Sequence, residues 1–135
     1  MNYGTIEKII KYHNEITHFI SEPDKGNYDA MNKEIFFAKG DWINFLNAGD
    51  RFLSKHTILE LVKNIKMTSD IVYGYVGIIY PNFCSTENLG NYKNLWRGMQ
   101  FSHQSAFIKL GYHKKTLFSL HNKISADFSF FLQGI

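Results

Sequence analysis

The feature that most constrains the fold is an alternation of helix-periodic segments with short apolar runs in the first half of the chain. Apolar residues recur at helical spacing in residues 5–15, 29–40 and 54–65. Between these segments lie two short runs typical of strands, "THFIS" (17–21) and "WINFL" (42–46). Such alternation is typical of α/β proteins, and an unbroken apolar run is typical of a strand buried in a parallel sheet. We therefore expect an α/β fold with a mainly parallel sheet flanked by helices.

The second half of the chain is less regular. Residues 70–80, "DIVYGYVGIIY", predict one long strand or a hairpin that bends at its glycines. Residues 81–98 are expected to be irregular, "SAFIKL" (105–110) predicts a strand, and "SADFSFFLQ" (125–133) predicts the start of a helix. With 135 residues in total, the chain has the length of one domain, since domains usually hold ~100–200 residues.

Composition and charge exclude several classes of protein. The net charge is only +3 and the lysines are scattered, so no basic stripe for nucleic acid is expected. The single cysteine, Cys84, cannot form an internal disulfide and fits a reducing compartment. The first residues lack the apolar core of a signal peptide, and no apolar run is long enough to span a bilayer. We expect a cytoplasmic location, with a peripheral contact at the inner face of the membrane left open.

Two polar loops each follow a predicted strand. The loop "EPDKGNYD" comes after residues 17–21, and the loop "NAGD" comes after residues 42–46. In open α/β sheets, ligands bind outside the carboxyl ends of the strands. Both loops are therefore expected at a binding edge of the sheet.

The first loop carries groups suited to a nucleotide or a sugar. Asp24 and Asp29 can accept hydrogen bonds from hydroxyl groups, and Lys25 can meet a phosphate as a point charge. Asn32 follows Asp29 by three residues, so on a helix the two side chains share a face. The alternative is an ordinary loop in which Asp29 caps the next helix.

The second loop carries groups suited to a divalent cation. Asn47 and Asp50 bracket the sharp turn "AG". Mg²⁺ takes oxygen ligands and usually binds one or two carboxylates together with substrate phosphates. Asp50 with Asn47 suits such a sparse protein shell, whereas the alternative is a turn without a ligand.

Other polar residues also allow two interpretations each. Asp127 lies near a predicted helix start, where the helix dipole alone favours a carboxylate. His103 is a candidate for a site or an ordinary histidine, and "NLWRGM" with Trp96 is an acceptor-facing loop or a packing segment. The remaining histidines do not have the spacing of zinc ligands.

Taken together, these segments resemble the family 2 glycosyltransferases, which are inverting nucleotide-sugar enzymes of the GT-A fold. The resemblance is strongest to bacterial members that build capsule, O-antigen or exopolysaccharide. It rests on four blocks in the family's order: "ISEPDKGNYDAMNKEIFFAKGDWINFLNAGDRF" (20–52), "DIVYG" (70–74), "FSHQSAFIK" (101–109) and "KISADFSFFL" (123–132).

The resemblance implies a role for each candidate residue. It implies transfer of a sugar from a nucleotide-diphosphate donor to a glycan or lipid-linked acceptor, assisted by Mg²⁺ or Mn²⁺. The implied general base is Asp127 and the implied metal ligand is Asp50. The residues implied for the donor pocket are Asp24, Lys25, Asp29, Asn32 and Asn47. The residues implied to contact the donor or the acceptor are Trp96, His103 and Gln104.

The chain also departs from the family pattern. Gly4 and Thr5 resemble the end of the family's "DGSTDGT" stretch. The family's first two strands, which hold the base and the ribose, have no counterpart before these residues. We therefore expect one truncated domain over residues 1–135, a partial GT-A, Rossmann-like fold that lacks the first nucleotide-binding strands. Exposed sheet edges and apolar faces would favour a homo-oligomer. The alternative function is a non-catalytic remnant that acts as a binding or assembly module.

Overall fold

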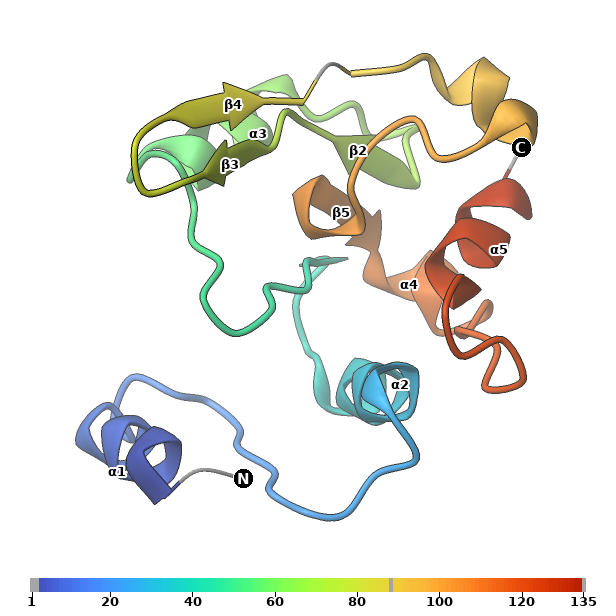
Figure 1. Cartoon of the computed structure of the whole chain (residues 1–135). Coiled ribbons are helices and arrows are strands. Elements are labelled where there is room, and N and C mark those ends of the chain that lie inside the picture. Colours follow the sequence, from blue (N-terminus) through green and yellow to red (C-terminus); the bar gives the residue numbers. More distant parts are fainter. Residues whose placement is uncertain (1–2, 88, 135) are drawn as a thin grey trace.

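The chain folds into short helices around two small sheets (Figure 1). The computed structural model describes residues 3–87 and 89–134. In chain order the elements are α1 (Tyr3–Lys11), α2 (Asn27–Phe37), β1 (Trp42–Ile43), α3 (Thr57–Asn64), β2 (Ile71–Tyr73), β3 (Gly77–Ile79), β4 (Cys84–Thr86), the 3₁₀ helices η1 (Tyr92–Arg97) and η2 (His103–Ser105), β5 (Ala106–Lys109), α4 (Leu110–His113) and α5 (Ala126–Leu132).

The main sheet has three strands in the order β1-β5-β2, and both neighbouring pairs are antiparallel. Trp42 pairs with Lys109, and Val72 pairs with Phe107. Because β1 and β2 both run opposite to β5, they point in the same direction, as a strand–helix–strand unit requires. The expected α/β character is therefore confirmed as a mixture of helices and strands. The expected mainly parallel sheet is wrong for the described residues, because β5 lies between the two strands that share a direction.

The second sheet is the hairpin of β3 and β4, in which Ile78 pairs with Ser85. The bend expected within residues 70–80 is present, but β2 and β3 flank it in different sheets and do not pair with each other. The segment expected to be irregular, residues 81–98, contains β4 and η1. Its exposed, polar strand β4 lacks the apolar alternation that would have indicated it.

The helices mostly lie where periodicity predicts them. The expectations for α3 and α5 are confirmed, and α2 begins at Asn27 rather than at Asp29. Gly26 is the N-cap of α2 with φ of 120°, a value that glycine adopts more readily than other residues. The strand expected at residues 17–21 is wrong: residues 12–26 contain no helix or strand, and no described sheet edge offers them hydrogen bonds.

The core lies between the main sheet and the helices α5 and η1. Along β5, Ala106 and Ile108 are buried in this core, while Phe107 stacks on Phe52 at a ring distance of 6.2 Å. The buried core side chains are Leu95, Phe101, Ala106, Ile108, Phe118, Ala126, Phe130 and Phe131. Figure 1 shows α2, α4 and α5 grouped near one another, whereas α1 stands apart at the end of the extended segment.

Candidate functional site

Asp127 is the centre of a polar group built from three distant segments. It lies in the first turn of α5, where both of its carboxylate oxygens accept hydrogen bonds. The Tyr28 hydroxyl donates to Oδ1 over 3.0 Å, and the backbone N–H of Phe128 donates to the same oxygen over 2.8 Å. His103 Nδ1 lies 3.1 Å from Oδ2. The first turn of α2, η2 and the first turn of α5 therefore meet at one carboxylate.

The group continues from His103 to the turn at residues 47–50. The side-chain nitrogen of Asn47 lies 3.5 Å from His103 Nε2. With the proton on Nδ1, His103 donates to Asp127 and presents Nε2 as an acceptor toward Asn47. The backbone N–H of Asn47 in turn donates to Asp50 Oδ2 over 3.0 Å. Hydrogen bonds thus connect Asp127 to Asp50 through two intermediate residues.

The surroundings keep Asp127 ionised and Tyr28 protonated. The hydrogen bond from His103 is the main cause that lowers the pKa of Asp127, and the Phe128 N–H and the Tyr28 hydroxyl lower it further against partial burial. Burial, with a smaller contribution from the hydrogen bond to Asp127, raises the pKa of Tyr28. At neutral pH the group therefore presents a fixed negative charge that is oriented by a tyrosine and a histidine.

The turn at residues 47–50 is closed by two reciprocal bonds. The Asn47 N–H donates to the Asp50 carboxylate, and the Asp50 N–H donates to the Asn47 carbonyl over 3.0 Å. Gly49 has φ of 93°, which a residue with a Cβ adopts only with strain. Asp50 Oδ1 and the Asn47 side-chain oxygen receive no hydrogen bond from the described residues. Carboxylate and amide oxygens are ligand types that a hard divalent cation takes. A cluster of three acidic, histidine or cysteine ligands does not occur among the described residues.

The loop before α2 forms its own local network. Asp24 accepts from the Gly26 N–H over 2.8 Å, and Asp29 accepts from the Lys25 N–H over 2.9 Å. That backbone bond is the main cause that lowers the pKa of Asp29, with Lys33 contributing less. The carboxylates of Asp24 and Asp29 thus shape the loop, while the ammonium group of Lys25 has no hydrogen-bond or ion-pair partner among the described residues. Tyr28, next to Asp29, connects this loop to Asp127.

Three other candidates lie differently. The amide of Asn32 is buried and pairs with the backbone of Phe118, donating to its carbonyl over 2.9 Å and accepting from its N–H over 3.0 Å. Trp96 is 71% exposed on η1 and stacks with Arg97. Gln104 accepts a short hydrogen bond from Ser102 and lines a cleft beside the 47–50 turn. The structure therefore joins Asp127, His103, Asn47 and Asp50, but it does not join Asn32 or Trp96 to them.

Tyr28 is the member of the group that the sequence did not indicate. Its hydroxyl bonds a residue 99 positions away, so no local spacing marks it. Its ring packs on Phe118 at 5.3 Å, and an aromatic residue in the first turn of a helix is more often a packing residue than a site residue. In the sequence, Tyr28 is near other candidate residues only because it belongs to the loop "EPDKGNYD".

Comparison with known proteins yields partial similarities to glycosyltransferases. An uncharacterised glycosyltransferase of Mycobacterium tuberculosis is 46% identical over 43 residues, which are 32% of this chain and 16% of that protein. A PGL/p-HBAD biosynthesis glycosyltransferase of Mycobacterium bovis is 38% identical over 64 residues, which are 46% of this chain and 25% of that protein. The matches thus span a quarter or less of the curated relatives. They support a glycosyltransferase.

Other comparisons find no match. No family model matches the chain, and no solved structure is significantly similar to it. Among the described residues, no helix is both long enough and apolar enough to cross a membrane.

Proposed function

We propose that this chain is part of an inverting glycosyltransferase of the family 2 type with a GT-A fold. It transfers a sugar from a nucleotide-diphosphate donor to a glycan or lipid-linked acceptor in the synthesis of surface polysaccharide. The observation that carries the proposal is the connected group Asp127–His103–Asn47–Asp50. One end of this group is an ionised carboxylate, and the other end offers oxygen ligands for a cation. The partial similarity to named glycosyltransferases supports the glycosyltransferase part of the proposal.

The chemistry of inverting transfer needs both ends of this group. The oxygen of an acceptor hydroxyl attacks the anomeric carbon, the bond from that carbon to the diphosphate breaks, and the hydroxyl proton must leave. Asp127 takes this proton, and His103 and Tyr28 hold its carboxylate in place. When bound at Asp50 and Asn47, Mg²⁺ or Mn²⁺ supplies a charge that neutralises the departing diphosphate.

Calorimetry with nucleoside diphosphates tests the donor half of the proposal. Titrating UDP, GDP and other nucleoside diphosphates into the chain, with Mn²⁺ or with chelator, should give tighter binding in the presence of the metal. Asp50→Ala should remove the metal dependence. The matched control is Asp41→Ala, because Asp41 is also an exposed aspartate and its side chain makes no hydrogen bond or ion pair with the described residues. It should bind like the wild type.

The same titrations separate the proposal from its alternative. Metal-independent binding that Asp50→Ala leaves unchanged would contradict a metal role for the 47–50 turn. If none of the nucleotides binds with or without metal, the chain does not hold a donor by itself. That result would favour a non-catalytic module that retains part of the fold.

A further inference from the structure

The hairpin of β3 and β4 belongs to a stretch of the chain without charge. Residues 71–86 contain no Asp, Glu, Lys, Arg or His, whereas charged residues make up 20% of the whole chain. An ionised side chain loses favourable solvation when it leaves water, so a segment without one can enter less polar surroundings. The composition of the hairpin therefore permits contact with such surroundings.

The turn of this hairpin presents apolar side chains to water. Ile79, Tyr80 and Phe83 are 59%, 43% and 61% exposed, and Pro81 is exposed between them. The rings of Tyr80 and Phe83 stack with their centres 4.4 Å apart. This cluster, residues 79–83, is the hairpin tip. Figure 1 shows it on the side of the molecule opposite α5, so the apolar side chains gather at a projecting position.

The tip is held in one shape by its own residues. The backbone N–H of Tyr80 donates to the Phe83 carbonyl over 2.9 Å across the turn, and Ile79 pairs with Cys84 next to it. Pro81 has a φ fixed at about −65°, which suits the second position of a turn. A binding partner therefore meets a preformed apolar surface, and little conformational entropy is lost on binding.

The size of the tip argues against a protein partner. An aromatic side chain carries about 150–250 Å² of surface, so at these exposures the tip offers on the order of 300–400 Å². Each partner of a stable protein complex buries about 800 Å², which is at least twice this area. A lipid surface, by contrast, adapts to a small projecting tip and needs no complementary surface of fixed shape.

From these observations we infer that the hairpin tip docks on the surface of a lipid bilayer. Ile79 and Phe83 enter the interfacial region, and Tyr80 lies at the level of the headgroups, where aromatic side chains with a polar end are enriched. The Asn82 amide and the backbone of the turn keep the tip in this hydrated region, because polar groups without partners are costly in hydrocarbon. The chain thus binds the membrane without crossing it.

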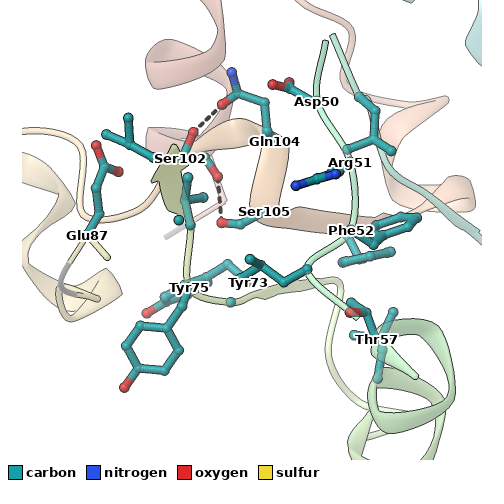
Figure 2. A pocket seen from close by; sticks show the side chains of 18 of the residues that line it. Asp50, Arg51, Phe52, Thr57, Tyr73, Tyr75, Glu87, Ser102, Gln104 and Ser105 are labelled. Carbon is teal, nitrogen blue, oxygen red and sulfur yellow. Dashed lines mark hydrogen bonds between the residues drawn. The ribbon is translucent and has the colours of Figure 1, made fainter. Parts of the chain in front are cut away.

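Docking at the tip brings a bilayer close to the candidate site. Residues 76–78, at the base of the hairpin, line a cleft of about 710 Å³ beside the 47–50 turn (Figure 2). Asp50, Arg51 and Glu87 also line this cleft, so its charged wall stays in water while the uncharged tip meets lipid. At about 3.4 Å for each strand residue, the outer end of the tip lies on the order of 10 Å from the base of the hairpin. The inference does not rest on the proposed transferase function.

Vesicle sedimentation tests the inference with the full chain. The probes are vesicles of phosphatidylcholine, and vesicles that also contain phosphatidylglycerol. A single myristoyl chain gives an association constant of about 10⁴ M⁻¹, so the tip should give a comparable or weaker value of about 10³–10⁴ M⁻¹. Binding to phosphatidylcholine should change little with added salt, because the tip carries no charge.

A pair of phenylalanine variants makes the test specific to the tip. Phe83→Asn removes a ring without adding a charge and should weaken vesicle binding by about tenfold. The matched control is Phe36→Asn, because Phe36 is also 61% exposed and lies on α2 outside the hairpin. It should bind like the wild type. Thermal melting checks that both variants fold, and Ile79→Asn repeats the test without changing the aromatic stack.

Cys84 provides a second readout of docking. It is exposed, pairs with Ile79 beside the tip, and is the only cysteine of the chain. A polarity-sensitive fluorophore attached to it should emit at shorter wavelength when phosphatidylcholine vesicles are added, and Phe83→Asn should remove this shift. The same fluorophore on α2, in a Phe36→Cys and Cys84→Ser variant, should show no shift because α2 stays in water.

Each outcome decides for or against docking by the tip. Binding to phosphatidylcholine that Phe83→Asn weakens and Phe36→Asn leaves unchanged would support the inference. Equal losses in the two variants would overturn it, and so would the absence of binding at lipid concentrations about tenfold above the expected dissociation constant. Binding only to phosphatidylglycerol vesicles that added salt abolishes would also overturn it. If no vesicle binds and Phe83→Asn lowers the mean mass in light scattering, the tip contacts another copy of the chain and the inference is wrong.

Discussion

At the scale of single residues, the carboxylate of Asp127 offers the sharpest test of catalysis. Asp127→Asn should lower sugar transfer by ~10²–10⁴-fold, because an amide cannot take the proton of the acceptor. The affinity for the nucleotide should remain nearly unchanged, since the base contacts the acceptor rather than the diphosphate. Transfer is measured over a panel of nucleotide sugars and glycoside acceptors, and the affinity by calorimetry.

Two companion variants give this prediction a reference. His103→Gln should lower transfer less than Asp127→Asn, because it removes an orienting partner and leaves the carboxylate. Tyr28→Phe should behave in the same way, since it removes one of three hydrogen bonds to that carboxylate. If Asp127 serves only the start of α5, Asn replaces it well and transfer stays close to that of the wild type.

Asn32 should act on stability. Its amide is 8% exposed and satisfies both the N–H and the C=O of Phe118. Asn32→Ala leaves these two backbone groups buried without a partner, at a cost of about 1–3 kcal/mol for each. Urea denaturation should show the loss. Asn27→Ala, at the exposed start of the same helix, should change stability by less than about 0.5 kcal/mol. Similar stabilities for the two variants would contradict the bracing role of Asn32.

The sequence could not separate these two kinds of residue. Asn32 shares a helix face with Asp29, and that spacing indicated a common ligand. Asn32 forms its hydrogen bond with Phe118, which is 86 positions away, so this contact arises from tertiary packing. His103 and Asp127 were named as candidates from the resemblance, whereas the bond between them and the role of Tyr28 became visible only in three dimensions.

At the scale of elements, the 47–50 turn depends on its glycine. Gly49 has φ of 93° and open space around it, so a methyl group there would meet backbone strain and no steric clash. Gly49→Ala should lower the free energy of unfolding by about 1–3 kcal/mol. The control Gly111→Ala lies in α4, also in open space but without a positive φ, and should be neutral or slightly stabilising. Thermal or urea unfolding that shows no difference between them would contradict the strain argument.

The elements that were predictable are those specified by their own residues. The apolar spacing of α3 and the residues of α5 indicate helices, and both are present. The direction shared by β1 and β2 follows from the helix between them. Their neighbours could not be predicted in this way, because β5 comes from much later in the chain and pairs with both. "WINFL" is accordingly a strand only at Trp42–Ile43, where β5 lies opposite it.

At the scale of the whole molecule, a buried histidine should make stability depend on pH. His113 is fully buried among the rings of Phe45, Phe118 and Phe130. Its Nδ1 donates to the Thr116 carbonyl over 2.9 Å, and its Nε2 is buried without a hydrogen-bond partner among the described residues. Burial therefore lowers the pKa of His113 below its ordinary value of 6.5.

The sign of the pH effect follows from that shift. Well above pH 6.5, His113 is neutral in the folded and unfolded chains and the full stability is present. As the pH falls below this value, the unfolded chain gains the proton first, so stability falls until the folded histidine also becomes protonated. Urea denaturation between pH 7.5 and about 5 should show this decline. His113→Phe should flatten it and the control His121→Gln should preserve it. An unchanged slope in His113→Phe would contradict the assignment.

Apolar side chains on the surface predict self-association. On α3, Ile58 and Val62 are 43% and 64% exposed, and Phe36 on α2 is 61% exposed. Exposed apolar side chains of this size favour contact between copies of the chain. Light scattering over a range of concentrations should show a rising mean mass, and Val62→Lys should reduce it. A monomer of constant mass at all concentrations would contradict the prediction.

The position of β5 between β1 and β2 also determines when the sheet can form during synthesis. Ile43 and Ile71 both pair with Ile108, so neither early strand has its partner until residues 106–109 leave the ribosome. Long loops must then close before any of these pairs is gained, which slows folding. Until that moment the nascent chain carries its apolar segments without the strand that organises them, and a chaperone that binds such segments would act in that interval.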